Sequence, residues 1–382
     1  MNLSSGFFVL IFSCILSSCF QDAEYAEDKA DQYAFKSVSI KYAKGFSVKH
    51  NNKETLLFIH DPNSGETLDT LNISGKEVGK IRSFKRIIAQ STTHFAFYQK
   101  IEVLSSVVGL CGMQYLSDGQ QKMLEKTTEV CSANGLEIEK IATLNPDLVF
   151  LYPFGDQDKI NFRKLGIKTV FITEYLENSP LARAEWIKFF ALISGQNPNE
   201  TCFEDIEKAY LNNSTVQSKV AKSNTHRNKT QPVIKSQDAK YSVIPKSVLF
   251  NLPFGDTWDM PPGNSISSRL VEDAGLSYFF RAEKKNGNLL FKLEEAYNYL
   301  MQADYWVIIA ARNAGFSRKD LLTENRIYQN FPAVKRKHVF FCNSQTTPYF
   351  SLAPVEPEIL LADLVNCVKG NDSGNKYFKI LR

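Results

Sequence analysis

The sequence predicts an α/β protein made of two α/β halves that flank a long helical stretch near residue 180. Three observations carry this prediction. Residues 147–152 (DLVFLY) form a near-continuous apolar run, as a strand in a parallel sheet requires, and a helical segment and a further strand follow. A long amphipathic helical pattern then begins at Ser179. Strands and helices alternate again from Ser247 onward, which indicates a second lobe.

The N-terminus carries a short apolar run, Phe7–Leu16, that is too short to span a bilayer and suits the core of a signal peptide. Ser17 and Ser18 lead from it into Cys19, a pattern that resembles the lipobox of bacterial lipoproteins. We therefore expect residues 1–18 to be removed and Cys19 to be acylated, which anchors the chain on the extracytoplasmic, periplasmic side of a membrane. An ordinary cleaved signal peptide with an incidental cysteine is the alternative.

Residues 19–35 are polar, charged and alanine-rich, and they predict a flexible tether between the lipid and the fold. A small antiparallel β element should follow, because β-type segments alternate with turn residues such as Lys44-Gly45. Its expected strands are Ser37–Tyr42, Phe46–His50 and Thr55–His60.

The N-terminal lobe, residues 36–178, is expected to contain a parallel sheet. A helix over Asp156–Leu165 should end at Gly166, which is a helix-stop signal. The expected strands are Arg86–Ala89, Val107–Leu110, Asp147–Tyr152 and Lys168–Ile172.

A bridging helical region is expected over residues 179–222. Ser179 is a suitable N-cap and Pro180 suits the first turn. Trp186, Phe189, Phe190 and Ile193 recur at helical spacing and predict one apolar stripe. A second helical stretch runs from about Asn199 to Lys219, and residues 223–246, which are polar and basic, read as a loop or insertion.

The C-terminal lobe, residues 247–382, repeats the alternation of strands and helices. Gly275 should end its first helix. The expected strands are Ser247–Leu252, Tyr305–Ala310 and His338–Cys342, and the expected helices are Ser265–Ala274, Leu293–Gln302 and Glu356–Val368.

Composition narrows the class of protein. The chain of 382 residues exceeds the usual limit of roughly 250–300 residues for one hydrophobic core, so two lobes are expected. The net charge of +4 is mild and the basic residues are dispersed, which does not favour nucleic-acid binding. After the N-terminal run, no stretch of about 18 apolar residues predicts a transmembrane helix.

Five cysteines remain beyond Cys19: Cys111, Cys131, Cys202, Cys342 and Cys367. Their spacing contains no CxxC or CxH pair, so we expect no zinc site. In an oxidising compartment one or two disulfides can form and at least one thiol is left over, whereas small buried core residues are the other interpretation. Sequence alone does not give the pairing.

Several segments together resemble the periplasmic substrate-binding proteins of ABC importers for iron–siderophore complexes, haem and cobalamin. The sharpest is Gly135–Phe150 (GLEIEKIATLNPDLVF), which is similar to the family's E-x-I-x-x-L-x-P-D-L-V signature. The others are Arg86–His94, Val107–Leu110, Gly263-Asn264-Ser265 and Asp273-Ala274-Gly275. The resemblance covers roughly residues 80–370. It implies two α/β lobes joined by a rigid helix, with a ligand cleft between them, in a monomeric receptor without a resident cofactor or metal.

The resemblance also implies where the chain would contact its permease. In cobalamin-binding relatives, a glutamate at the position of Glu139 pairs with arginines of the permease, so Glu139 is the docking candidate on the N-terminal lobe, with Glu137 as a substitute. The matching position in the C-terminal lobe is Asn264, a departure from the family's glutamate. Either the contact shifts to Glu272 or Asp273, or neutral hydrogen bonds replace it.

A cleft of this family is lined by loops at the carboxyl ends of strands. An aromatic-rich set with few charges suits a large flat metal chelate, which would be the small-molecule partner. Arg312 is a candidate partner for a carboxylate or phosphate of the ligand, and His94 or Tyr349 for its metal. The ligand-binding candidates are Ser91, Thr92, Thr93, His94, Tyr115, Tyr152, Phe154, Glu174, Tyr175, Trp258, Met260, Arg312, Asn313, Tyr349 and Phe350.

Two other functions are alternatives to the hypothesis that the protein is a receptor for a metal complex. A chelatase or reductase on a similar scaffold would need an acid–base or ligand set, but the sequence contains no HExxH, GxSxG or strand-following GxGxxG pattern. A surface lipoprotein used for protein interaction would have a filled, degenerate cleft. We therefore expect a binding protein rather than an enzyme.

Overall fold

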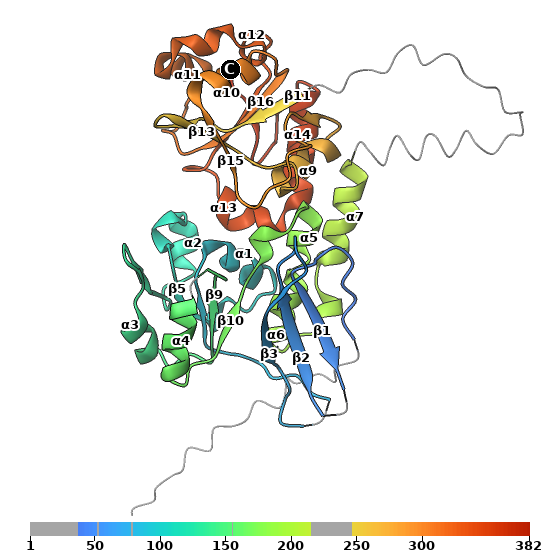
Figure 1. Cartoon of the computed structure of the whole chain (residues 1–382), viewed down its shortest axis with the longest axis vertical. Coiled ribbons are helices and arrows are strands. Elements are labelled where there is room, and N and C mark those ends of the chain that lie inside the picture. Colours follow the sequence, from blue (N-terminus) through green and yellow to red (C-terminus); the bar gives the residue numbers. More distant parts are fainter. Residues whose placement is uncertain (1–36, 52, 78, 155, 215–246) are drawn as a thin grey trace, which may run out of the picture. The chain divides into compact units, whose positions relative to one another are not determined.

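A computed structural model describes residues 37–51, 53–77, 79–154, 156–214 and 247–382. The predicted signal peptide, Cys19, the tether and the insertion 223–246 lie outside the described residues. Within the described part, two lobes can be followed in Figure 1, one built from residues before the bridging helices and one from residues after them. In that part, no helix is both long and apolar enough to cross a membrane.

A three-stranded antiparallel sheet, β1 (Phe46–His50), β2 (Thr55–His60) and β3 (Thr67–Asn72), stands at the start of the described chain. Two of the three expected strands are confirmed, but Ser37–Tyr42 is not a strand, and the third strand comes after β2 instead. The reason is local: the N–H groups of Lys41 and Tyr42 donate to the carboxylate of Glu185 rather than to a neighbouring strand.

The sheet of the N-terminal lobe is parallel, with the order β10-β9-β4-β5-β6. All four residues of β9 are buried, as the apolar run in the sequence predicts. The strands are β4 (Ile87–Ala89), β5 (Val107–Leu110), β6 (Thr128–Glu129), β9 (Leu148–Leu151) and β10 (Thr169–Phe171), a hairpin is formed by β7 (Cys131–Ser132) and β8 (Gly135–Leu136), and the helices are α1 (Thr92–Lys100), α2 (Asp118–Lys122), α3 (Ile138–Thr143) and α4 (Asp156–Lys164).

The bridging stretch is not one continuous helix. It consists of α5 (Pro180–Ala184), α6 (Ile187–Ile193) and α7 (Phe203–Asn213). The break between α5 and α6 lies at Glu185, whose buried carboxylate accepts hydrogen bonds from the N–H groups of the irregular segment 41–43. Every residue of α6 is buried, so core packing on all sides, rather than one apolar stripe, fixes this segment.

The C-terminal lobe has the sheet order β14-β11-β16-β17-β18, in which only the short β18 is antiparallel to its neighbour. The strands and helices expected here are confirmed to within a few residues. The main-sheet strands are β11 (Ser247–Phe250), β14 (Ser277–Tyr278), β16 (Tyr305–Ala310), β17 (Val339–Asn343) and β18 (Lys379–Ile380), a small antiparallel sheet contains β12 (Pro253–Phe254), β13 (Thr257–Met260) and β15 (Leu289–Lys292), and the helices are α9 (Ile266–Asp273), α10 (Leu293–Leu300), α11 (Arg318–Glu324), α12 (Pro332–Lys335), α13 (Tyr349–Leu352) and α14 (Pro357–Val368).

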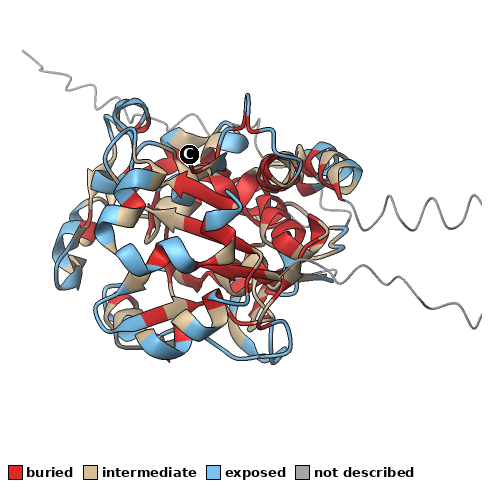
Figure 2. Cartoon of the chain, turned by 90° about the horizontal axis from the view of Figure 1, so that it is seen from above, coloured by how far each residue is buried: buried red, intermediate tan, exposed pale blue. Residues whose placement is uncertain are grey.

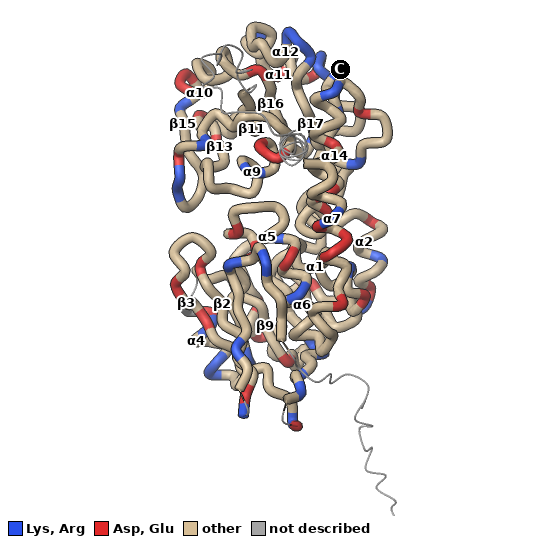
Figure 3. Tube along the Cα trace, turned by 90° about the vertical axis from the view of Figure 1, so that its right-hand side faces the viewer, with Lys and Arg blue, Asp and Glu red and all other residues tan. Residues whose placement is uncertain are grey.

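Each lobe has its own hydrophobic core, and α7 contributes to both. Phe203 and Ile206 belong to the core of the N-terminal lobe, and Tyr210, about one turn further on, belongs to the other core. Figure 2 shows buried residues concentrated in the strands and in the inner faces of the helices. Basic and acidic residues are interspersed over both lobes (Figure 3), which agrees with the mild net charge.

Candidate functional site

A pocket of about 590 Å³ is lined by loops from both lobes. The lower wall belongs to the N-terminal lobe and consists of the loops after β4 and β5. The upper wall belongs to the C-terminal lobe and consists of the loops after β16 and β17. All four loops therefore lie at the carboxyl ends of parallel strands. The lining residues are Ser91, Thr92, Thr93, Gln114, Tyr115, Leu116, Ser117, Gln120, Ala311, Ser344, Gln345, Thr346, Thr347, Pro348, Tyr349, Phe350 and Ser351.

The first wall segment is the start of α1. Ser91 is the N-cap, and its hydroxyl accepts a hydrogen bond from the Thr93 N–H. The Thr93 hydroxyl in turn donates to Glu174, at 2.8 Å. A pocket-lining threonine is therefore fixed by a carboxylate that lies beneath it.

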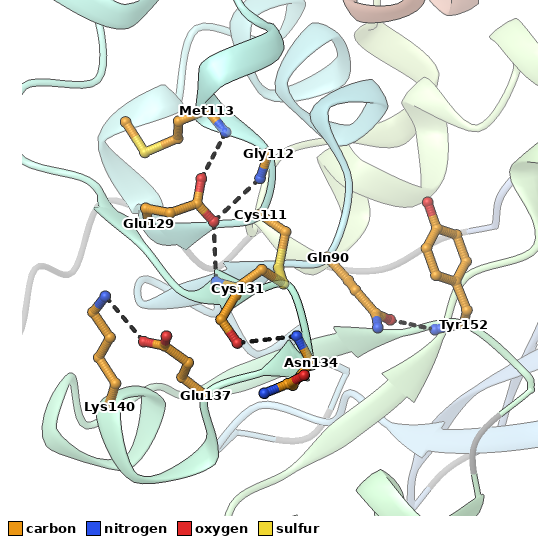
Figure 4. Close-up of a disulfide and its surroundings, with 11 residues drawn as sticks. Gln90, Cys111, Gly112, Met113, Glu129, Cys131, Asn134, Glu137, Lys140 and Tyr152 are labelled. Atoms are coloured by element: carbon orange, nitrogen blue, oxygen red, sulfur yellow. Dashed lines mark hydrogen bonds and ion pairs between the residues drawn. A yellow bond between two sulfur atoms is a disulfide. The ribbon is translucent and has the colours of Figure 1, made fainter.

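The second wall segment, residues 112–117, is held by a disulfide and a carboxylate (Figure 4). Cys111 is bonded to Cys131, and Glu129 accepts hydrogen bonds from the N–H groups of Gly112, at 3.2 Å, and Met113, at 2.7 Å. Gly112 has a φ of 81°, and a Cβ there would lie 3.1 Å from the Tyr115 ring. This position therefore needs glycine for Tyr115 to fold back over the loop.

The disulfide also answers the question that the sequence left open about pairing. Cys202, Cys342 and Cys367 are free thiols. Cys111, Cys131 and Glu129 bring ligand-type atoms within 4.8 Å of one another, but the bond between the two sulfurs uses both thiols. As described, the cluster has a structural role in the loop.

The upper wall is organised by Asn343, the last residue of β17. Its side-chain oxygen accepts from the N–H groups of Arg312 and Gln345, both at 3.1 Å, and its amide nitrogen donates to the Arg312 carbonyl, at 2.8 Å. One amide therefore ties the loops after β16 and β17 together. Beyond these loops, at the start of α13, the rings of Tyr349 and Phe350 contact each other edge to face.

The two walls are hydrogen-bonded to each other through the buried side chains of Gln120 and Ser351, which belong to opposite lobes. The Gln120 amide donates to the Ser351 hydroxyl, at 2.9 Å, and both side chains are buried. This contact joins the two lobes at the pocket.

Below the lower wall lies a buried polar group made of His94, Glu174 and Arg183. Arg183 pairs with Glu174 at 3.2 Å, and neither ring nitrogen of His94 has a hydrogen-bond partner among the described residues. Burial lowers the pKa of His94 to about 4, with Arg183 acting in the same direction, so the ring is neutral at physiological pH. Burial raises the pKa of Glu174, but the Arg183 charge and the hydrogen bond from Thr93 act in the other direction, and the pKa is lowered overall, which keeps the carboxylate ionised.

Five of the predicted cleft residues line this pocket: Ser91, Thr92, Thr93, Tyr115 and Tyr349, together with Phe350 from the wider candidate set. Tyr152, Phe154 and Tyr175 form a separate aromatic cluster whose ring centroids lie 5.2 to 6.2 Å apart. The Tyr152 N–H is fixed by the Gln90 side chain, at 2.7 Å (Figure 4). This cluster follows β9 and β10, beside the pocket-lining loop after β4.

Four predictions are wrong for the described conformation. Trp258 and Met260 are fully buried in the C-terminal core, because the small sheet β12-β13-β15 turns them inward, and the Trp258 ring nitrogen donates to the Phe250 carbonyl. His94 packs against Phe150 and Phe190 instead of facing a ligand. Arg312 is bidentate to Glu324 and does not line the pocket.

Most of the lining residues that sequence reasoning missed are polar. Gln114, Ser117 and Gln120 follow β5, and residues 344–348 and Ser351 follow β17. Only their position directly after predicted strands could have indicated that these residues line the pocket. Serines, threonines and glutamines do not stand out in a loop, where such residues are ordinary.

The two docking candidates differ in their surroundings. Glu139 is exposed on α3 and has no ion-pair partner among the described residues, whereas Glu137 pairs with Lys140 at 3.1 Å. Asn264 is half-buried and is hydrogen-bonded to Asn63 and to the Lys285 N–H. Asp273, an alternative to Asn264, is buried against Arg269 and Tyr210.

Comparison with known proteins identifies a family, two relatives in sequence and several solved structures that share the fold. A family model described as periplasmic binding protein matches residues 87–346. Two uncharacterized lipoproteins of Methanocaldococcus jannaschii are 29% identical over 73% of this chain and 25% identical over 65% of it. The chain spans 64% and 60% of the lengths of these two relatives.

Solved structures with the same fold come from bacteria. The catecholate-siderophore binding protein VctP of Vibrio cholerae has a TM-score of 0.54 at 13% identity, with 78% of this chain and 96% of that chain covered. The nickel–histidine complex of Helicobacter pylori CeuE has a TM-score of 0.52 at 16% identity, with 80% and 88% covered. At these identities the likeness concerns the fold alone.

Proposed function

Because the chain belongs to the periplasmic binding protein family, we propose that it is an extracytoplasmic receptor that binds a metal complex and delivers it to the permease of an ABC importer. The observation that supports this most is the pocket of about 590 Å³, which both lobes line at the carboxyl ends of their strands. An iron–siderophore complex, haem or a corrinoid is the proposed ligand. Lipid attachment at Cys19 would hold the receptor at the membrane.

Binding in this account needs no covalent step. Exposed aromatic rings at the rim, Tyr115 and Phe350, supply apolar area, and the hydroxyl and amide groups of the walls supply hydrogen bonds. Because α7 contributes to both cores, the lobes are joined by a packed element rather than by a loose linker. We therefore propose that closure on the ligand is small.

Calorimetric titration of the protein with ferric siderophores, haemin and cobalamin tests this proposal. Replacement of an exposed ring in Phe350→Ala or Tyr115→Ala removes apolar contact and should weaken binding about tenfold or more. Leu165→Ala is the matched control, because Leu165 is similarly exposed but does not line the pocket. If none of these complexes binds saturably, the proposal is contradicted.

Delivery to a permease is proposed to use Glu139. Its exposed carboxylate is available to a cationic partner, and charge reversal in Glu139→Lys should lower uptake in cells while ligand affinity stays unchanged. Glu294→Lys, which reverses the charge of an exposed glutamate that is not a docking candidate, serves as the comparison. Equal uptake by the Glu139→Lys variant and the unmodified protein would rule out this contact.

A further inference from the structure

Among the residues that the structure describes, the walls of the pocket between the lobes carry no charged side chain. All 17 lining residues are uncharged, and 11 of them are serine, threonine or glutamine. Charged residues make up 23% of the sequence, so about four would be expected among 17 residues taken at random. The lining is therefore uncharged, and it combines hydroxyl and amide groups with two tyrosine rings and one phenylalanine ring.

Several charged groups beside the walls are engaged with each other or with the backbone. Glu174 lies beneath Thr93 and pairs with Arg183, so the pair presents no net charge to the pocket. Glu129 is occupied by the N–H groups of the loop 112–113. Arg312 is turned away in its bidentate pair with Glu324.

One feature favours an anion, namely the N-terminus of α1, which points at the lower wall. Its effect is limited, because the Thr93 N–H donates to the Ser91 hydroxyl and the His94 N–H donates to the Ser91 carbonyl. What remains is a fraction of one elementary charge at a single helix end. It does not replace a cationic side chain for a ligand that carries several negative charges.

We propose that this pocket selects a metal chelate without net charge and discriminates against polyanionic chelates. The inference rests on the proposed function and narrows its ligand. Hydroxyl and amide groups can donate to or accept from the carbonyl, hydroxyl and amide groups of a neutral chelate. A polyanion buried among the same groups loses its hydration without gaining a cationic partner, which costs affinity.

Titration with four probes of different charge tests the proposal. The uncharged probes are ferrichrome and cyanocobalamin, and the anionic ones are ferric enterobactin, a trianion, and haemin, which carries two propionates. We expect one of the uncharged probes to bind at least tenfold more tightly than either anionic probe. We also expect its affinity to change less than twofold between low and high salt, since no ion pair forms with the ligand.

A designed charge makes the test sharper. Gln114→Lys places a cation on the exposed part of the wall and should raise the affinity for ferric enterobactin severalfold, whereas Gln329→Lys, at an exposed glutamine outside the pocket, should not. Tighter binding of an anionic probe to the unmodified protein would overturn the inference while supporting a receptor function. Failure of all four probes to bind would instead overturn the receptor function, and this inference with it.

Discussion

At the scale of single residues, His94 is a buried histidine whose ring nitrogens have no partner among the described residues. Its pKa in the folded protein is about 4, whereas an unperturbed histidine titrates near 6.5, so the unfolded chain binds the proton more readily. The contribution of the neutral His94 ring to the free energy of unfolding is therefore fully present above pH 6.5, and it is lost as the pH falls toward 4.

The corresponding prediction concerns unfolding free energy. When the pH is lowered from 7.5 to 5, the titration of His94 should reduce the free energy of unfolding of the unmodified protein by about 2 kcal/mol. The His94→Phe variant should lack this reduction. Denaturant unfolding at the two pH values measures it, with His50→Gln, at an exposed histidine, as the control. An equal loss in the His94→Phe variant and the unmodified protein would show that His94 is not the titrating group.

Single residues are also where sequence reasoning was weakest. An aromatic residue after a strand predicts a cleft position. Tyr115 and Tyr349 line the pocket between the lobes, whereas Trp258 is buried in the C-terminal core. Trp258 lies on β13 of a small sheet that the sequence pattern did not reveal, and this sheet packs it against Trp306 and Tyr297. The direction of a side chain depends on such tertiary packing, which local pattern does not encode.

At the scale of elements, the loop after β5 is the best-anchored part of the pocket. The disulfide joins Cys111 to Cys131, which are 20 residues apart in the sequence. The cross-linked segment therefore begins one residue before Gly112. Cross-linking a segment of this length restricts the unfolded chain and is worth about 3 kcal/mol in the chain-entropy account.

The double variant Cys111→Ser, Cys131→Ser should therefore lose about 3 kcal/mol of unfolding free energy and bind its ligand more weakly. Calorimetric unfolding and ligand titration of the same sample separate the two effects. Cys342→Ser, which changes a free thiol in the C-terminal core, is the comparison for a cysteine that is not cross-linked. Unchanged ligand affinity in the double variant would show that the disulfide does not position the loop.

Elements were predicted well where the apolar pattern is strong. Strands β9 and β16 and the helix α14 appear close to where apolar runs and caps placed them. The segment 37–42 was mistaken for a strand because its β-type composition does not reveal that Glu185, more than 140 positions away, supplies the acceptor for its N–H groups. The same distant contact accompanies the break between α5 and α6.

At the scale of the whole molecule, the two cores and the helix that enters both of them explain how the pocket is positioned. The loops that line it come from opposite lobes, and the Gln120–Ser351 hydrogen bond shows that the lobes already meet there. The two-lobed α/β organisation was predictable because alternating strands and helices are counted along the chain. The pairing of the walls was not, because it depends on contacts between residues more than 200 positions apart.

In the proposed receptor, one ligand contacts both lobes at this pocket. Hydrogen–deuterium exchange, measured with and without a saturating concentration of the metal complex that binds most tightly, tests it directly. We expect slower exchange upon binding in three segments together: 91–95, 112–120 and 344–352. Protection confined to one lobe, or located away from these segments, would contradict the claim.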